Sequence, residues 1–228
     1  MTNWKEIYQS KLTTAEEAIK LINDGDKVVT GFGCGEPFAI ERALVDNYQN
    51  YHDVQIVNML TLGDSPWCRP EMKGHFTLNC LFASQSNRKA ISLGVSEFTT
   101  SHFYEIPDLI KNYIRPRVTI VMVSPPDEHG YVSFGTTVDY TRGTADYCDI
   151  KIAQVNKYMP RTFGNSFMHI RDFTCFVEHD EPLPEVKTVE ISDTEMEIGK
   201  YCASLINDGD CLQLGIGGIP NAVCAQLW

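Results

Sequence analysis

The sequence has few basic residues: 19 Lys and Arg stand against 30 Asp and Glu, which gives the 228-residue chain a formal net charge of −11. A chain with this balance has no general electrostatic attraction to nucleic acid or to anionic lipid. We therefore expect neither nucleic acid nor a membrane among its partners. An anionic ligand would have to be held locally, by helix N-termini and main-chain amides.

The pattern of a metal site is missing as well. The eight cysteines include no C-x-x-C pair, and no cysteine–histidine cluster has zinc-ligand spacing. Several cysteines lie in apolar segments, as Cys80 does, where a reduced thiol acts as a small apolar side chain. No apolar run is long enough to cross a membrane, and the first residues lack the apolar core of a signal peptide. We expect no metal, reduced thiols and a cytoplasmic location.

What the sequence does contain is an alternation of short apolar runs with helical patterns. A first helix is expected after Thr13 or Thr14, either of which can cap it, with Glu16 and Glu17 three residues on. Strands are expected at residues 27–30, 54–60, 76–82, 118–123, 131–134, 150–155 and 173–177, and further helices at 38–48, 107–114 and 138–145. This alternation predicts an α/β fold with a largely parallel sheet flanked by helices on both faces.

One stretch of six residues occurs twice: Leu-Ile-Asn-Asp-Gly-Asp stands at 21–26 and at 205–210, an offset of 184 (206 − 22). Each copy follows a helical pattern and precedes an apolar run, a glycine-rich loop and a new helix. For the second copy the apolar run is 211–214, which we expect to form a strand. The repeat predicts one full domain over residues 1–185 and the start of a homologous second domain over 186–228.

The join between the two predicted domains is the polar, proline-bearing stretch 178–187, which is typical of a linker. The sequence ends at Trp228, within the helix expected to open at Pro220. The apolar face of that helix over 223–227 would have nothing to pack on. We therefore expect the second domain to be truncated.

The two glycine loops are the strongest candidates for a binding site. Gly31, Gly33 and Gly35 belong to the first loop, and Gly215, Ile216, Gly217, Gly218 and Ile219 form the second. Missing side chains let main-chain N–H groups approach an anion, and the following helix N-terminus adds partial positive charge. One such loop is more often a plain turn, but two in repeated contexts indicate a function.

The loop sequences disfavour three known phosphate sites. A dinucleotide fingerprint requires a third glycine, where this chain has Glu36 and Pro220, and Asn58 stands where the ribose-binding acid is expected. No Gly-Lys-Ser/Thr follows either loop, which excludes a P-loop. Cys34 and Glu36 flank Gly35 where sugar-phosphate isomerases of related architecture have Ser or Thr.

Residues 213–223, Gln-Leu-Gly-Ile-Gly-Gly-Ile-Pro-Asn-Ala-Val, resemble the glycine motif that opens the second domain of the acetyl-CoA hydrolase/transferase family. Within these family I CoA-transferases, the chain looks most like the 4-hydroxybutyrate and butyrate:acetate enzymes. Residues 59–63 (Met-Leu-Thr-Leu-Gly), 123–131 (Val-Ser-Pro-Pro-Asp-Glu-His-Gly-Tyr) and 198–206 are also similar. The resemblance runs from Trp4 to Trp228.

The resemblance implies transfer of CoA between an acyl-CoA and acetate, butyrate or 4-hydroxybutyrate through a glutamyl-CoA thioester. CoA is then a substrate, no metal or other cofactor is implied, and the full-length protein is expected to be a homo-oligomer. The family's CoA-binding stretch corresponds to Gly215, Ile216, Gly217, Gly218 and Ile219, and we expect Gly31, Gly33 and Gly35 to line the carboxylate pocket. The nucleophilic glutamate of the family lies in a His-Thr/Ser-Glu-Met segment beyond Trp228. No catalytic residue is therefore expected in this chain, and no transferase activity from this chain alone.

Two alternative functions stay open: an acyl-CoA hydrolase on the same scaffold, and a non-catalytic module that binds an anion or a phosphosugar. His129 is either a general base or, as we prefer, a polar turn residue. Cys34 is more simply a small filler than a nucleophile. Three arginines could bind either CoA phosphates or acidic side chains of the protein: Arg69, Arg88 and Arg142. Three aromatic residues are expected in the core: Phe163, Phe167 and Phe173.

Overall fold

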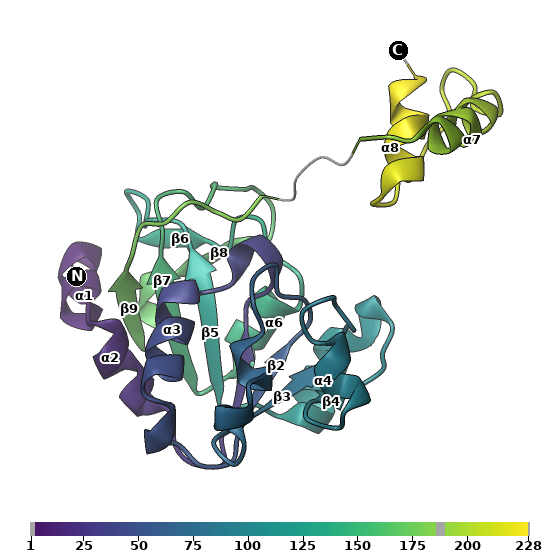
Figure 1. Ribbon diagram of the computed structural model, residues 1–228. Helices are drawn as coiled ribbons and strands as arrows, with labels where there is room; N and C mark the ends of the chain where they lie inside the picture. The colour runs from purple at the N-terminus through teal and green to yellow at the C-terminus, as the bar shows by residue number, and fades with distance from the viewer. Residues whose placement is uncertain (1–2, 186–189, 228) are drawn as a thin grey trace. The chain divides into compact units, whose positions relative to one another are not determined.

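The computed structural model describes residues 3–185 and 190–227. The chain divides into two compact units, Met1–Pro184 and Glu185–Trp228 (Figure 1). Residues 186 and 187 of the expected linker and Trp228, where the second expected domain ends, lie outside the described residues.

The first unit is built on a seven-stranded sheet with the order β4-β3-β2-β1-β5-β7-β9 (Figure 1). Its strands are β1 (Lys27–Thr30), β2 (Val54–Asn58), β3 (Phe76–Cys80), β4 (Glu97–Phe98), β5 (Val118–Val123), β7 (Ile150–Val155) and β9 (Cys175–Glu178). Every neighbouring pair is parallel. The predicted α/β fold with a parallel sheet is confirmed, and of the strands expected in the first unit all but one lie in this sheet.

The exception is the run expected as a strand at 131–134. It forms β6 (Tyr131–Ser133), but β6 pairs antiparallel with β8 (Phe167–His169) in a separate two-stranded sheet. Only the last part of the run expected at 173–177 is a strand, since a single 3-10 turn, Ile170–Asp172, and Phe173 precede β9.

Helices cover the sheet, and most were expected. They are α1 (Trp4–Lys11), α2 (Ala15–Ala18), α3 (Phe38–Asp46), α4 (Arg88–Ser92), α5 (Ile106–Leu109) and α6 (Tyr140–Tyr147). Shorter turns stand at Ile19–Leu21, Gly33–Gly35, Tyr48–Asn50, Pro66–Cys68, Pro70–Met72 and Phe103–Glu105, and a π-helical turn at Ile110–Ile114 continues α5. Thr14 caps α2 by accepting a hydrogen bond from the amide of Glu17, as the sequence indicates. The sequence interpretation missed α1 and α4.

The apolar strands are buried on both faces of the sheet. Side chains alternate along β1, so Val28 packs with one core cluster and Val29 with another. The Val28 cluster includes Ile40 and Leu44 of α3, and the Val29 cluster includes Ile110. Burial of one such aliphatic side chain contributes about 1.5–3 kcal/mol. These two faces explain why a central strand such as β5 is almost continuously apolar rather than alternating.

The order of the strands indicates where a ligand would bind. The chain runs outward from β1 to β4 on one side and from β5 to β9 on the other, so the direction of winding reverses between β1 and β5. In such sheets, ligands bind outside the carboxyl ends of the strands at this reversal. Gly31 directly follows β1 and Ser124 directly follows β5, so both loops lie at that edge.

The second unit consists of α7 (Asp193–Ala203) and α8 (Gly218–Ala225) with the turns between them. The helices meet closely, because a Cβ added to Gly199 would lie 2.6 Å from the carbonyl carbon of Ala222. Val223 is buried at this contact, so the expectation that the face over 223–227 has nothing to pack on is wrong for Val223, while Leu227 is exposed.

The run expected as a strand at 211–214 does not form one. A β-strand requires a hydrogen-bonded neighbour, and the described residues of the second unit supply none. Leu212 and Leu214 are instead exposed. This part of the sequence-based interpretation is wrong for the structure as it stands.

The two copies of the repeat nevertheless fold alike. The amide of Asn23 donates to Oδ2 of Asp26 at 2.7 Å, and the amide of Asn207 donates to Oδ2 of Asp210 at 2.8 Å. In the first copy, Asp26 also binds the guanidinium of Arg117, the residue before β5. The same six residues therefore make the same turn in both units.

All eight cysteines are free, and Cys80, Cys148 and Cys175 are buried. Among the described residues, no helix combines the length and the apolar character needed to cross a bilayer.

Candidate functional site

The first glycine loop follows β1 at the reversal of the sheet. Its glycine amides are already bonded: Gly31 donates to the carbonyl of Ile120 at 3.0 Å, Gly33 to Leu60 at 2.8 Å and Gly35 to Phe32 at 3.0 Å. A ligand at this loop must therefore be held by groups other than these three amides.

Packing and backbone geometry explain why glycine stands at these positions. A Cβ on Gly31 would collide with the carbonyl oxygen of Gly35, and a Cβ on Gly35 would collide with the side chain of Thr137. Gly33 has φ +60°, a left-handed conformation that glycine adopts without steric cost. The loop is thus a tightly packed wall, with a shape set by close approach of its own backbone.

A buried carboxyl joins this loop to the loop after β2. Oε2 of Glu36 accepts a hydrogen bond from the hydroxyl of Thr61 at 2.8 Å and one from the amide of Leu62 at 3.3 Å. Glu36 is only 2% exposed. It therefore fixes the Gly31–Gly35 turn against residues 59–63, one of the segments that carry the family resemblance.

A second buried carboxyl, that of Glu41 in α3, lies near Glu36. Burial raises the pKa of Glu36 above its ordinary 4.5, and the negative charge of Glu41 raises it further. Burial also raises the pKa of Glu41. Oε1 of Glu41 has no hydrogen-bond partner among the described residues. Two carboxyls in one buried site cannot both ionise readily, so the pair retains a proton near neutral pH.

The sequence interpretation did not identify this pair. It assigned Glu36 no role, and it did not single out Glu41. One signal was present: Glu41 lies between Ile40 and Leu44, on the stretch of α3 that faces the core. An ionisable residue next to core positions of a helix indicates a buried charge.

Polar side chains beneath the loop hold the end of β1. The amide nitrogen Nδ2 of Asn58 donates to Oγ1 of Thr30 and to the carbonyl of Gly31, each at 2.8 Å. The hydroxyl of Tyr140 donates to the carbonyl of Thr30 at 3.1 Å. Asn58, the residue found where a ribose-binding acid was sought, is therefore a support for the glycine loop.

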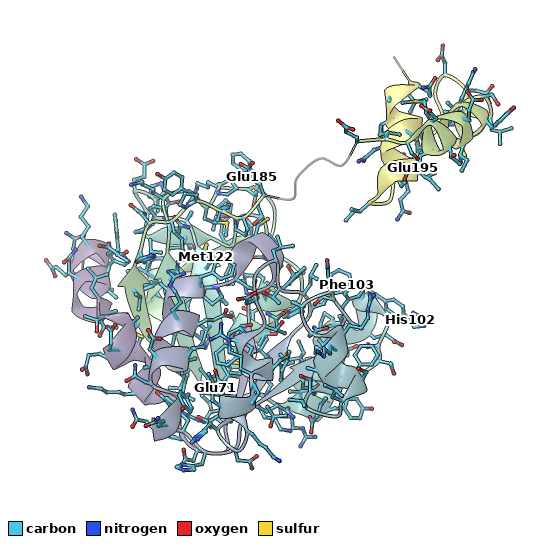
Figure 2. The ribbon with its side chains drawn as sticks, viewed as in Figure 1. Glu71, His102, Phe103, Met122, Glu185 and Glu195 are labelled. Carbon is cyan, nitrogen blue, oxygen red and sulfur yellow. The ribbon has the colours of Figure 1, made fainter. Side chains whose placement is uncertain are left out.

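One side of the loop is aromatic. The ring of Phe32 stacks on that of Tyr140, with centroids 5.4 Å apart and an interplanar angle of 16°. Phe103 meets the same Phe32 ring edge-on at 6.4 Å and 75°. Phe103 comes from the segment after β4 and is 52% exposed. Figure 2 labels it beside His102.

The other side of the loop is formed by residues 179–184, part of the stretch expected as a linker. Glu181 accepts hydrogen bonds from Gln154 at 2.9 Å and from Arg42 at 3.0 Å. The thiol of Cys34 donates to the carbonyl of Pro184 at 3.3 Å. The linker assignment is wrong for 178–184, because Glu178 ends β9 and these tertiary bonds attach the rest to the first unit. Cys34 acts here as a packing and donor group.

The second glycine loop differs in how its amides are used. Gly217 precedes the first turn of α8 with φ +141°, and no side chain caps this helix. Within the described ranges, no hydrogen bond involves the main-chain amides of Gly215, Ile216, Gly217, Gly218 and Ile219. Ile216 is fully exposed. The loop thus presents unoccupied donors at a helix N-terminus, the arrangement that favours an anion.

Gly218 also has a packing role. A Cβ at this position would collide with the carboxyl of Glu195 in α7. Glu195 is held there as the partner of Ser192 in a capping box, with the Ser192 amide donating to Oε2 at 2.8 Å (Figure 2). A side chain at position 218 would displace the Glu195 carboxyl from its place in this capping box.

The remaining candidates have structural explanations. His129 lies on an exposed turn in which Oδ1 of Asp127 accepts from the amides of His129 at 2.9 Å and Tyr131 at 2.8 Å. This is the expected turn role. Arg142 pairs with Asp146.

The other two arginines bind within the protein, since Arg69 lies 3.8 Å from Asp64 and Arg88 donates to the carbonyl of Ala83. The expectation of a core position is right for Phe173, which is buried, and wrong for Phe163, which is 92% exposed.

Gly31, Gly33 and Gly35 thus lie together in the first unit, and residues 215–219 lie together in the second. Their assignment to CoA and to a carboxylate substrate stays a prediction.

Comparison with known proteins gives one family. The family model described as acetyl-CoA hydrolase/transferase N-terminal domain matches residues 1–187. The chain is 44% identical over 221 residues to a 4-hydroxybutyrate coenzyme A transferase of Clostridium kluyveri, covering 96% of this chain and 52% of that protein. It is 32% identical over 237 residues to a butyryl-CoA:acetate CoA-transferase of Anaerostipes caccae, covering 99% and 52%.

Solved structures agree. RipA from Yersinia pestis matches with a TM-score of 0.92 and 30% identity, covering 98% of this chain and 55% of that one. A 4-hydroxybutyrate CoA-transferase from Porphyromonas gingivalis matches with a TM-score of 0.84 and 37% identity, covering 98% and 53%. The chain therefore spans about half the length of these relatives, and the resemblance noted from the sequence is confirmed.

Proposed function

Because this chain belongs to the acetyl-CoA hydrolase/transferase family, we propose that the full-length protein transfers CoA between an acyl-CoA and a short-chain carboxylate. Acetate, butyrate and 4-hydroxybutyrate are the candidate carboxylates. The observation that supports this proposal most strongly is the second glycine loop, where main-chain donors that no group of residues 3–185 and 190–227 accepts from stand at the start of α8.

The proposed reaction has two halves. A glutamate carboxylate attacks the thioester carbonyl, CoA leaves as a thiolate, and an acyl-glutamyl anhydride forms. The thiolate then attacks the glutamyl carbonyl of the anhydride, which releases the first carboxylate and leaves a glutamyl-CoA thioester. The acceptor carboxylate reverses both steps. We place the glutamate beyond Trp228, in the His-Thr/Ser-Glu-Met segment of the family, so no residue of this chain has the role of nucleophile.

The second loop would stabilise the negative charge that develops on the thioester oxygen during these steps. Each attack forms a tetrahedral intermediate with an oxyanion, and amides already oriented toward it stabilise it without reorganisation. The amides of Gly218 and Ile219, in the first turn of α8, are suited to this role, and Gly215, Ile216 and Gly217 would contact CoA.

The first loop would shape the carboxylate pocket. The amides of Gly31, Gly33 and Gly35 are bonded to protein carbonyls, so in this proposal they form a wall and do not bind the carboxylate. The hydrogen bonds that Glu36 accepts from Thr61 and from the amide of Leu62 hold this wall in place. No metal or prosthetic group takes part, and CoA enters as a substrate.

The experiment is a transfer assay with the full-length protein, butyryl-CoA and acetate, which should yield acetyl-CoA and butyrate. Release of free CoA at the same rate without acetate would show a hydrolase instead. No reaction with any acyl-CoA, together with phosphosugar binding by calorimetry, would support the non-catalytic alternative. Residues 1–228 alone should show no transfer. Light scattering of the full-length protein would test the expected homo-oligomer.

A further inference from the structure

An aromatic side chain far from the glycines in sequence borders the first loop. Phe103 opens a single 3-10 turn, Phe103–Glu105, in the segment between β4 and α5 (Figure 2). A capping box fixes this turn, with the amide of His102 donating to Oε2 of Glu105 at 3.1 Å. Phe103 is therefore held in place by its own backbone, and it contacts Phe32 of the glycine loop.

The support behind Phe103 is rigid. Phe32 is stacked on Tyr140, which is 2% exposed and donates its hydroxyl to the carbonyl of Thr30 at the end of β1. The three rings form a continuous aromatic cluster, in which Phe32 stacks on Tyr140 and meets Phe103 edge-on. At its outer end, Phe103 is about half exposed, and its ring lies against Phe32 of the loop that follows β1.

This placement bears on how short carboxylates can be told apart. Acetate and butyrate carry the same carboxylate and differ only by two methylene groups. The glycine amides of the first loop are bonded to protein carbonyls, so they cannot distinguish the longer alkyl chain from the shorter one. An apolar surface can, because each buried methylene favours binding by about 0.8 kcal/mol.

We propose that Phe103 is a specificity-determining residue that contacts the alkyl chain of the acyl group and favours longer chains over acetyl. The inference rests on the proposed transfer of CoA and adds to it a residue and a substrate preference. The neighbouring Tyr104 supplies a matched control. It is 78% exposed, and its ring stacks on His102 at 5.8 Å instead of contacting the glycine loop.

The experiment measures kcat/KM of the full-length protein with butyryl-CoA and with acetyl-CoA, each with a fixed acceptor. Phe103→Ala should lower the butyryl-to-acetyl ratio about fivefold or more, mainly by loss of butyryl activity. Phe103→Leu should keep most of the ratio, because it restores an apolar side chain. Tyr104→Ala should leave the ratio unchanged. If Phe103→Ala does not fold, Phe103→Gln keeps the length of the side chain and should lower the ratio in the same way.

The outcomes separate this inference from the proposed function. Wild-type protein that transfers CoA, with a ratio unchanged in Phe103→Ala and Phe103→Gln, would overturn the role of Phe103 alone. Equal loss of both activities would do the same, because it would indicate a structural role. Wild-type protein that transfers CoA from neither thioester would overturn the proposed function and this inference with it.

Discussion

The hydroxyl of Thr61 donates a hydrogen bond of 2.8 Å to the carboxyl of Glu36, which joins the loops after two neighbouring parallel strands. Glu36 lies next to the last glycine of its loop, and Thr61 lies three residues beyond the end of β2. The bond is partly buried and lies at the edge of the sheet where the strands have their carboxyl ends. Through this bond, the shape of the first glycine loop is linked to the ionisation state of the Glu36 side chain.

Glu36→Gln should change how stability depends on pH. The unfolded chain loses the Glu36 proton near its ordinary pKa, whereas burial and Glu41 raise the pKa of Glu36 in the folded protein. As pH rises between these values, the folded state holds the proton that the unfolded state has lost, so folding stability falls. Glutamine stays neutral and can still accept from Thr61. We expect the substitution to raise the free energy of unfolding at pH 8 by about 1–3 kcal/mol and to have little effect at pH 4.

Urea denaturation of the same chain at several pH values measures this. Glu71→Gln serves as the control, since Glu71 is exposed and its neutralisation should leave the profile unchanged. Parallel pH profiles for wild type and Glu36→Gln would show that Glu36 is not protonated in the folded state.

Arg117→Met should destabilise the first unit. Arg117 donates to Oδ1 of Asp26 at 2.8 Å and to the carbonyl of Leu21 at 2.7 Å, and the Asp26 side chain is only 10% exposed. Removing the cation leaves a largely buried carboxylate without its partner, which we expect to cost about 2–4 kcal/mol. Arg115→Met, on an exposed side chain two residues earlier, should cost much less.

The stability that the Arg117–Asp26 pair contributes changes with pH in the opposite direction to the contribution of Glu36. Burial raises the pKa of Asp26, but hydrogen bonds from Arg117 and Asn23 outweigh it and hold the pKa below its ordinary 3.8. This stabilisation is present above the ordinary value and is lost as pH falls through the lowered one. Denaturation at pH 7 and pH 3 should therefore show a smaller cost of Arg117→Met at the lower pH. An equal cost at both pH values would contradict this.

Gly35→Ala should strongly destabilise the first loop. The added methyl would collide with the side chain of Thr137, and overpacking of this kind costs about 1–3 kcal/mol. Gly143→Ala is the matched control: Gly143 lies within α6, a Cβ there would meet no heavy atom within 4 Å, and alanine favours a helix by about 1 kcal/mol. Thermal unfolding should show a lower Tm for Gly35→Ala and an equal or higher Tm for Gly143→Ala. Similar changes in both would contradict the packing explanation.

Much of the fold could be predicted because its signals are local. Mainly apolar runs such as 118–123, capped helix starts such as Thr14 and glycines at strand ends are each visible in the sequence. The failures have a common physical cause. Residues 211–214 have the pattern of a strand, but a strand forms only beside a neighbour. Residues 179–184 have the composition of a linker, but Glu181 is bound by Arg42 and Gln154, which are distant in sequence.

The candidate site was predictable in part for the same reason. Both glycine loops were located from the spacing of their glycines alone. Spacing did not show that the amides of the first loop are bonded and those of the second have no acceptor among the described residues, because this depends on whether carbonyls such as those of Ile120 and Leu60 accept from them. The aromatic contact of Phe103 with Phe32 spans 71 residues (103 − 32) and has no local pattern. The sequence motifs identified the two loops, but tertiary hydrogen bonds determine which loop has main-chain amides available to a ligand.

The most direct test is amide hydrogen exchange of the full-length protein with and without butyryl-CoA. We predict that exchange at Gly215, Ile216, Gly217, Gly218 and Ile219 is fast in the free protein and slows when the thioester binds. Gly31, Gly33 and Gly35 should exchange slowly in both states, because their amides are already bonded. Slowing confined to other segments, with residues 215–219 unchanged at saturating butyryl-CoA, would contradict the assignment of the second glycine loop to CoA.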